Sequence, residues 1–239
     1  MFAYALTGIR KIRRTRTSRF VLAIDDLRIA QSEAVGLLGE SGSGKSTLLD
    51  LLGMVVAPDE AESFSFLPLG HSEIRVDHLW RKAKLDALTG LRARHMGYVL
   101  QNGGLLPFLA VRDNINLSRR ILGLAEDGTV EDLVRTLGIA RVARQFPRTL
   151  SVGERQRVAI ARSLAHRPTV ILADEPTASL DPVNADRVLR LLLELARDQG
   201  ATVIVATHDR EVVRRLGLRP ITHTVAETSD GTVVSTVRG

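Results

Sequence analysis

The chain has 239 residues, no cysteine and a formal net charge of +6. Its 44% hydrophobic and 25% charged residues are ordinary for a globular protein, and the length allows one domain, or one domain with a lobe. The lack of cysteine excludes disulfides and thiolate chemistry. No apolar run approaches the ~20 residues that cross a bilayer. The first residues are too short and too polar for a signal peptide, so we expect the chain to stay where it is made.

The charge is concentrated near the N-terminus. Six basic residues fall within ten positions: Arg10, Lys11, Arg13, Arg14, Arg16 and Arg19. Such a run fits nucleic acid, anionic lipid head groups or a bound nucleotide, but a solvated edge strand blunted by charge is the simpler interpretation. No aromatic residues interleave with these charges, which disfavours nucleic acid as a partner.

Strands are expected first in the chain. Apolar residues at 20–24 and 27–30 flank a predicted turn at Asp25-Asp26, and a third apolar run covers 34–38. A glycine-rich segment then precedes a helix-like run at 48–52, which is the strand–loop–helix context of a phosphate-binding P-loop. The segment comprises Gly39, Glu40, Ser41, Gly42, Ser43, Gly44, Lys45, Ser46 and Thr47.

This loop predicts nucleotide binding. Its glycines let successive N–H groups point at a polyphosphate, and the helix start adds free amides and a positive dipole end. Lys45 is expected to reach the β- and γ-phosphates, and the Ser46 hydroxyl to hold Mg²⁺.

The middle of the chain changes character. Short edge elements at 64–69 and 74–80 precede a helix at 81–94 and a buried strand at 96–100. Residues 103–166 then show helical patterns without a clear strand, with amphipathic stretches at 130–137 and 152–165.

Strands return after the helical stretch. Residues 170–173 and 203–206 are apolar throughout, with a predicted helix at 188–196 between them. Strands that are apolar on both faces indicate a mostly parallel sheet covered by helices. A hairpin with strands at 221–225 and 232–236 and a turn at Asp230-Gly231 is expected to end the chain.

Polar residues follow three of the apolar strands. Asp174 and Glu175 come directly after residues 170–173, where ligands bind in open α/β sheets. Asp174 is suited to organise Mg²⁺, and Glu175 to polarise the water that attacks a γ-phosphate. His208 and Gln101 also end strands; the histidine fits a γ-phosphate contact, and the glutamine amide fits either Mg²⁺ or the attacking water.

Two helix starts carry further candidates. Ser151 is expected to cap the helix at 152–165, with Glu154 completing a capping box, while the same free amides can face an anion such as the ATP of a second monomer. Asp181-Pro182 is suited to begin another helix.

Together these residues resemble one family, the ATP-binding-cassette (ABC) transporter nucleotide-binding subunits. Residues 39–47 resemble its Walker A motif, Gln101 the Q-loop, 150–154 the signature motif and 170–175 Walker B. Residues 179–181, which include Asp181, resemble the D-loop, and His208 the switch histidine. The block at 105–115 is similar to cassettes of the macrolide-export and lipoprotein-release type.

The resemblance implies an α/β P-loop NTPase fold and an ATPase that uses ATP and Mg²⁺. It implies a single domain, 1–239, with a RecA-like core and N-terminal antiparallel β elements in 1–102 and 167–239, and a helical subdomain in 103–166. Two cassettes, most simply a homodimer, would clasp two ATP molecules, with Ser151, Gly153 and Asp181 contributing across the dimer. Closure would drive separate transmembrane permease subunits, which would contact the cassette near Gln101. The contact residues would be Leu105, Leu106, Phe108 and Leu109. The alternative is that these four side chains pack inside the helical subdomain.

Two departures from the family pattern stand out. The signature motif usually has Gly where this chain has Val152 and Gln where it has Glu154, which predicts weaker dimer closure or a specialised partner. The family stacks adenine on an aromatic residue, whereas this chain offers Arg13 or Arg14, whose guanidinium plane can stack; Phe20 comes later and is expected to face the core.

The resemblance places the protein at the cytoplasmic face of the inner membrane, as a peripheral subunit without a nucleic-acid partner. Other classes stay open: an importer ATPase, a regulatory cassette, or a soluble ABC ATPase acting on DNA or ribosomes. DNA-clasping relatives carry long coiled coils and ribosome-acting relatives carry two cassettes, and this sequence has neither.

Overall fold

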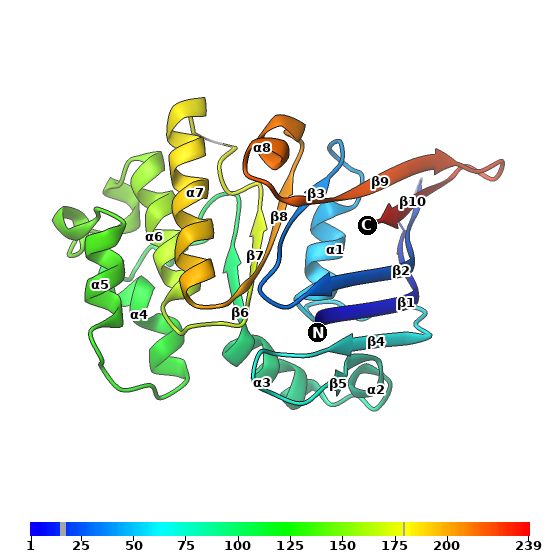
Figure 1. Ribbon diagram of the computed structural model, residues 1–239, viewed down its shortest axis with the longest axis horizontal. Helices are drawn as coiled ribbons and strands as arrows, with labels where there is room; N and C mark the ends of the chain where they lie inside the picture. Colours follow the sequence, from blue (N-terminus) through cyan, green and yellow to red (C-terminus); the bar gives the residue numbers. More distant parts are fainter. Residues whose placement is uncertain (15–17, 179) are drawn as a thin grey trace. The chain divides into compact units, whose positions relative to one another are not determined.

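The computed structural model describes residues 1–14, 18–178 and 180–239 (Figure 1). Arg16 and Ser179 of the sequence predictions therefore lie outside the described residues. The described chain forms two units, Met1–Arg92 with Ile204–Gly239, and Ala93–Val203. The predicted boundaries of a helical subdomain at 103 and 166 stay a prediction.

The first unit is built on a mixed sheet. Its strands are β1 (Phe2–Arg14), β2 (Arg19–Ala30), β3 (Ala34–Leu38), β4 (Ser63–Phe66), β5 (Ile74–Arg75), β9 (Arg219–Glu227) and β10 (Thr232–Arg238). They lie in the order β5-β4-β1-β2-β10-β9-β3, followed by β8 (Thr202–Thr207), which the chain enters from the second unit. The neighbours β1, β2, β4 and β5 run antiparallel, whereas β10 with β2 and β3 with β9 run parallel.

The predicted turn at Asp25-Asp26 is wrong, because β2 runs through both residues without a break. Asp26 lies opposite Thr7 in the ladder with β1, and the Asp25 carboxylate accepts a hydrogen bond of 2.9 Å from Arg10. The apolar neighbours Ile24 and Leu27 are fully buried. The burial of these flanking residues and the cross-strand ion pair outweigh the turn preference of aspartate.

The helices of the first unit also differ from prediction in two places. They are α1 (Lys45–Leu52), α2 (Val76–Arg81), α3 (Leu85–His95) and α8 (Arg210–Arg215), where α3 ends beyond the boundary of the unit. The expected edge element at 74–80 becomes helical from Val76, and the expected helix at 81–94 is interrupted where Ala83 takes a positive φ of 49°.

An aromatic cluster anchors α1 to the antiparallel strands. The rings of Tyr4 and Phe66 lie 5.1 Å apart between centroids, and Phe64 lies 6.5 Å from Tyr4. All three side chains are fully buried, and the Tyr4 hydroxyl donates to the Leu52 carbonyl oxygen at 3.0 Å. The last turn of α1 is thereby fixed to β1.

The second unit contains the helical stretch expected from the sequence. Its elements are β6 (Met96–Val99), α4 (Val111–Ile121), α5 (Thr129–Thr136), the 3₁₀ turns η1 (Ala140–Val142) and η2 (Pro147–Thr149), α6 (Val152–Leu164), β7 (Val170–Asp174) and α7 (Pro182–Asp198). Strands β6 and β7 pair in parallel. A Cβ on Gly97 would lie 2.2 Å from the Ser163 carbonyl oxygen, so glycine lets β6 and α6 approach closely.

The predicted fold class is confirmed: an α/β protein with an N-terminal antiparallel β region and a helical stretch in mid-chain. None of the helices in the described ranges is both long and apolar enough to cross a membrane.

Candidate functional site

The glycine-rich loop joins β3 to α1 in the first unit. Gly44 caps α1 in the left-handed region with φ 99°, and a Cβ there would come within 2.9 Å of the Phe20 ring. A Cβ on Gly39 would lie 2.3 Å from the Ser43 hydroxyl oxygen. Gly44 therefore requires glycine for its backbone angle, and a side chain at position 39 would displace the Ser43 hydroxyl.

Lys45 and Ser46 begin α1, as predicted. The Lys45 side chain is buried, and its Nζ donates to the carbonyl oxygens of Gly39 and Glu40 at 2.6 and 3.0 Å. The ammonium group is thus held within the curve of the loop, where the phosphates of a nucleotide bind. Ser46 is exposed beside it, while Thr47 is buried.

Two other predicted residues lie in the first unit. His208 is exposed directly after β8, and Asp209 caps α8 by accepting hydrogen bonds from the amides of Glu211 and Val212. Arg13 lies on β1 and makes an ion pair of 3.3 Å with Asp50 of α1. Its guanidinium group is therefore held beside the helix that starts at the loop.

Phe20 was expected to face the core, but the structure places it elsewhere. Its side chain is only half-buried and lies against Gly44. In the basic segment, Arg10 pairs with Asp25, Lys11 with Asp59 at 3.1 Å and Arg13 with Asp50. These contacts support the interpretation of a charged, solvated strand rather than a free basic patch.

The second unit carries the acidic pair. Asp174 ends β7 and Glu175 follows it, both partly buried, at the carboxyl end of the strand as predicted. Glu175 takes a positive φ of 43°, which is uncommon for a residue with a side chain. Backbone strain of this kind is found at functional sites, where the surrounding structure maintains it.

Gln101 is exposed after β6, at the start of a loop with two consecutive left-handed residues, Gly103 and Gly104. Arg162 of α6 fixes this loop by donating to the carbonyl oxygens of both glycines, at 2.9 and 2.7 Å. Burial lowers the pKa of its guanidinium group. Arg162 was not predicted as a functional residue, although a charge directly after the apolar residues 158–161 was a signal.

The signature segment begins α6 with the capping box predicted. The Ser151 hydroxyl oxygen accepts from the Glu154 amide at 3.3 Å, and the Glu154 carboxylate accepts from the Ser151 amide at 2.9 Å. A Cβ on Gly153 would make ordinary van der Waals contacts with the ends of two side chains, Arg157 at 3.5 Å and Leu180 at 3.8 Å. Val152 is 41% exposed.

Asp181 caps α7, as predicted, by accepting a hydrogen bond of 3.1 Å from the Asn184 amide. A second hydrogen bond of 2.6 Å comes from the Asn184 side chain. Before it, the Leu180 amide donates to the Thr177 carbonyl oxygen at 3.0 Å.

The apolar loop at 105–110 is anchored by a residue that the sequence analysis did not single out. Asn114 of α4 is fully buried and holds both the amide and the carbonyl oxygen of Leu106, at 2.8 and 3.0 Å, and the carbonyl oxygen of Leu109 at 2.9 Å. Phe108, between these two leucines, is 71% exposed. The available signal was that Asn114 directly precedes the apolar Ile115 and lies three positions after Val111, so it falls on the apolar face of the helix.

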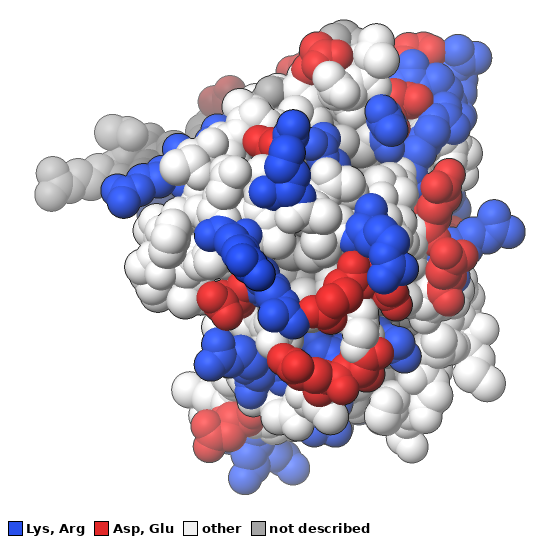
Figure 2. Space-filling view, turned by 90° about the vertical axis from the view of Figure 1, so that its left-hand side faces the viewer, with Lys and Arg blue, Asp and Glu red and all other residues white. Residues whose placement is uncertain are grey.

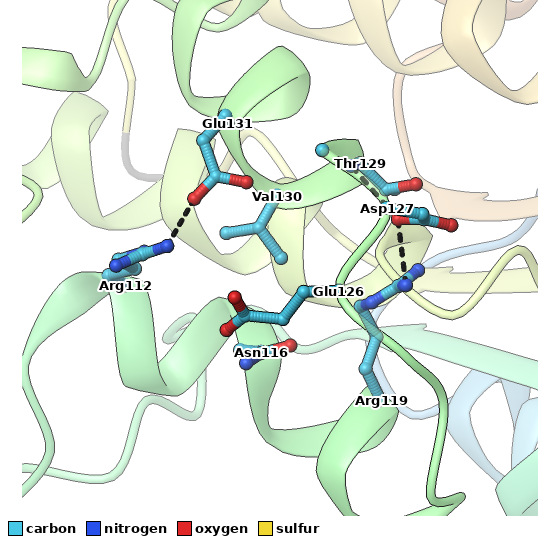
Figure 3. Close-up of a pocket in the computed structure, with 9 residues that line it drawn as sticks. Arg112, Asn116, Arg119, Glu126, Asp127, Thr129, Val130 and Glu131 are labelled. Carbon is cyan, nitrogen blue, oxygen red and sulfur yellow. Dashed lines mark hydrogen bonds and ion pairs between the residues drawn. The ribbon is translucent and has the colours of Figure 1, made fainter.

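A small pocket lies between α4 and the start of α5 (Figure 3). Arg119 donates to Asp127, and Arg112 pairs with Glu131 across it. Hydrogen bonds from Thr129, and then from Arg119, lower the pKa of Asp127 to about 2. The pocket has a volume of ≈ 10 Å³, which has room for about one water molecule. These ion pairs therefore join the two helices rather than bind a ligand.

A glycine-rich loop between a strand and a helix, with a buried lysine held within it, defines the protein as a P-loop nucleotide-binding protein. Comparison with known proteins agrees. The family described as ABC transporter matches residues 22–178.

The relatives are ATP-binding proteins. The lipoprotein-releasing system ATP-binding protein LolD of Hyphomonas neptunium is 39% identical over 82% of this chain and 83% of its own length. The macrolide export ATP-binding/permease protein MacB of Bradyrhizobium diazoefficiens is 39% identical over 91% of this chain and 31% of its own length.

Solved structures show the same fold. The dimeric bacterial ABC transporter cassette MJ0796 matches with a TM-score of 0.77 and 33% identity over 92% of this chain and 93% of that one. A dimer of MJ0796 in a post-hydrolysis state with ADP and Pi matches over the same shares, with a TM-score of 0.75 and 31% identity. The chain belongs to the ABC transporter family, as one of its ATP-binding ATPase subunits.

Proposed function

We propose that two copies of this cassette bind two ATP molecules head to tail and that closure of the pair drives transport through separate membrane subunits. Each site would draw on both partners. One chain would contribute Lys45, Ser46, Gln101, Asp174, Glu175 and His208, and the other Ser151, Gly153 and Asp181. The loop around the buried Lys45 supports nucleotide binding most directly, and the dimeric structures of MJ0796 support pairing.

Mg²⁺ fits the residues available. Ser46 exposes a hydroxyl in the first turn of α1, and Asp174 presents a carboxylate at the end of β7. Hydroxyl and carboxylate oxygens are the hard ligands that Mg²⁺ takes, together with nucleotide phosphates and water. Bound there, the ion would neutralise charge that develops on the phosphates. Nucleotide phosphates and water would supply the remaining ligands, with the Gln101 amide as a further candidate.

Hydrolysis would use side chains that the fold places at strand ends. Glu175 would polarise the attacking water, and His208 would contact the γ-phosphate. Lys45 would leave the carbonyl oxygens of Gly39 and Glu40 for the β- and γ-phosphates. Gln101 would contact either the ion or the water, on a loop held by Arg162.

Phe108 supports a membrane partner. Its aromatic side chain is 71% exposed on a loop that Asn114 fixes, so it is available for contact with another protein. Figure 2 shows the side of the molecule on which α4 and α5 lie, where acidic and basic side chains are interspersed. Such mixing favours a protein partner over a nucleic acid, whose sites are basic. We propose that Phe108 docks on a transmembrane permease at the cytoplasmic face of the inner membrane. The transported substrate would be a lipoprotein or an exported compound, since the relatives are LolD of a lipoprotein-releasing system and the macrolide export protein MacB.

The test uses Glu175→Gln, which removes the carboxylate but keeps its shape. With saturating Mg-ATP and the membrane partner, we expect this variant to form a stable dimer and to lose at least about 100-fold in ATPase rate. Lys45→Ala is the matched control, since it should lose both nucleotide and dimer. A Glu175→Gln protein that never pairs under these conditions would contradict the proposal.

Co-purification tests the partner. We expect the chain to co-purify with a membrane protein, and Phe108→Ser to weaken that association while Phe146→Ser, at another exposed aromatic residue, does not. Retention on DNA or ribosomes instead would assign the protein to another branch of the family.

A further inference from the structure

The C-terminal hairpin places two polar residues beneath the phosphate-binding loop. Strand β9 pairs antiparallel with β10 (Figure 1). In this ladder His223 lies opposite Val237, and Val225 lies opposite Ser235. His223 and Ser235 are therefore diagonal neighbours on one face of the hairpin. The His223 Nδ1 lies 3.2 Å from the Ser235 hydroxyl oxygen.

Ser235 connects this hairpin to the loop. Its side chain is completely buried, and its hydroxyl donates to the Ser43 carbonyl oxygen at 2.6 Å. A serine hydroxyl has a single hydrogen, so the contact with His223 must be one in which the Ser235 oxygen accepts. His223 therefore carries its proton on Nδ1 and completes a chain of hydrogen bonds from β9 through β10 to Ser43.

The same histidine lies close to two other residues of the loop. Its Cβ is 3.5 Å from the position that a Cβ on Gly39 would take. Burial, and then the positive charge of Lys45, lower its pKa to about 4. The ring is thus neutral at neutral pH, where it donates from Nδ1 without placing a second cation beside Lys45.

The bond to Ser43 has a consequence for the next peptide group. In a trans peptide the C=O of one residue and the N–H of the next point in opposite directions. A Ser43 carbonyl held toward Ser235 therefore directs the Gly44 amide to the other side, and Gly44 is the residue that precedes Lys45 at the start of α1. Amides at that position are the ones that bind phosphate in a P-loop.

Two atoms beside this chain of bonds have no hydrogen-bond partner among the described residues. They are the Ser43 hydroxyl oxygen and His223 Nε2, and both are buried. Buried polar atoms without partners are uncommon and call for a reason beyond packing. Holding the loop in a form suited to phosphate, at the expense of these two atoms, is such a reason.

We propose that His223 and Ser235 are positioning residues of the nucleotide site, which orient the Ser43–Gly44 peptide so that the Gly44 amide faces the phosphates. The inference rests on ATP binding by this loop. It makes the C-terminal hairpin, which carries no family motif, a part of the nucleotide-binding apparatus.

The test measures the Kd of a fluorescent N-methylanthraniloyl derivative of ATP, with Mg²⁺, on the full chain. Loss of one hydrogen bond to a buried carbonyl predicts a Kd about three- to tenfold higher in Ser235→Ala, with unchanged stoichiometry. His223→Leu should raise the Kd similarly. Ser235→Thr keeps the hydroxyl, and His223→Asn keeps an N–H donor in place of Nδ1–H. Both variants should have a Kd within about twofold of that of the unsubstituted chain.

Thr224→Ala is the matched control, because Thr224 adjoins His223 but is exposed. A purely structural role would reduce the fraction of protein able to bind and leave the Kd of the remainder unchanged, which stoichiometry reveals. The inference is wrong if Ser235→Ala and His223→Leu bind like the unsubstituted chain, or if Thr224→Ala weakens binding as much. Should Ser235→Ala fold poorly, Ser235→Cys keeps the volume and tests the same bond.

Failure of the proposed function looks different. A chain that binds no ATP, with Lys45→Ala behaving identically, would contradict the site itself and this inference with it. If the chain binds ATP, Lys45→Ala abolishes that binding and neither hairpin variant changes the Kd, only the inference about His223 and Ser235 is contradicted.

Discussion

The carboxylate of Glu154 accepts hydrogen bonds from both the amide and the hydroxyl of Ser151, at 2.9 and 2.8 Å. These two bonds, followed by the nearby Arg141, hold the pKa of Glu154 below its usual value. The glutamate is thus a helix cap whose negative charge is already compensated by its neighbours. Of the two departures in the signature segment, Val152 is the one that leaves an uncompensated feature, an exposed apolar side chain at the helix start.

We therefore expect Val152→Gly to have the larger effect on cassette pairing. Removing the side chain lets the backbone before Gly153 approach an anion more closely, so the ATPase rate and the ATP-dependent dimer fraction should rise about two- to tenfold. Steady-state ATPase assays and size-exclusion chromatography with Mg-ATP measure both.

Glu154→Gln is the companion variant. It removes the charge but keeps an oxygen that accepts from the Ser151 amide, so we expect a smaller change in rate and a loss of about 0.5 kcal/mol in the free energy of unfolding. If both variants, singly and together, leave ATPase rate and dimerisation unchanged, the signature substitutions do not weaken closure.

Adenine recognition gives a second prediction, with Arg13 and Phe20 as rivals. Arg13 is held beside α1 by Asp50, and Phe20 lies half-buried against Gly44. Stacking on the Arg13 guanidinium predicts that Arg13→Ala raises the Kd for ATP about three- to tenfold, while Arg13→Lys, which keeps charge but not the plane, restores little.

Parallel titrations with ATP and GTP check this prediction, and Arg14→Ala tests the other arginine whose guanidinium plane can stack. If Arg13→Ala leaves both affinities unchanged while Phe20→Ala lowers them, the base stacks on the aromatic ring instead.

The sequence predicted those parts of the site that local chemistry specifies. A strand, a glycine-rich loop and a helix start are adjacent in the chain, so residues 39–47 were identified directly. The capping box at Ser151 and the cap at Asp181 are also local, because each bond spans three residues. The fold class followed from apolar strands separated by helical segments.

Contacts between distant segments could not be predicted in this way. Ser235 and Ser43 are separated by 192 positions, and Arg162 reaches Gly104 across 58. Nothing local to either pair specifies the partner, because only the folding of distant segments onto one another brings the two residues together. The wrong turn at Asp25-Asp26 has the same origin, because the pairing of β2 with β1 overrides a local preference.

His223 gives a prediction about stability and pH. Its pKa is lowered from 6.5 to about 4 in the folded chain by burial and then by Lys45. The unfolded chain therefore binds more protons between pH 6.5 and 4, so the free energy of unfolding falls as the pH falls through this window. We expect a loss of about 1–2 kcal/mol between pH 7 and 5 from this group.

Urea unfolding at both pH values measures this loss. His223→Leu should remove the corresponding part of the pH dependence, whereas His71→Asn, at an exposed histidine of the same unit, should keep it. Equal pH dependence in all three proteins would show that His223 titrates at its ordinary value.

Asn114 gives the last prediction, because its side chain links the apolar loop at 105–110 to α4 through the amide and carbonyl oxygen of Leu106 and the carbonyl oxygen of Leu109. Asn114→Ala removes the partner of these partly buried backbone groups, which costs about 1–3 kcal/mol in the free energy of unfolding. Because Phe108 lies between Leu106 and Leu109, we also expect weaker co-purification with the membrane partner, at a temperature well below the midpoint of unfolding. Asn116→Ala, two positions further along α4 and half-buried, is the control. Full co-purification by a measurably destabilised Asn114→Ala protein would show that the loop docks without being held in place.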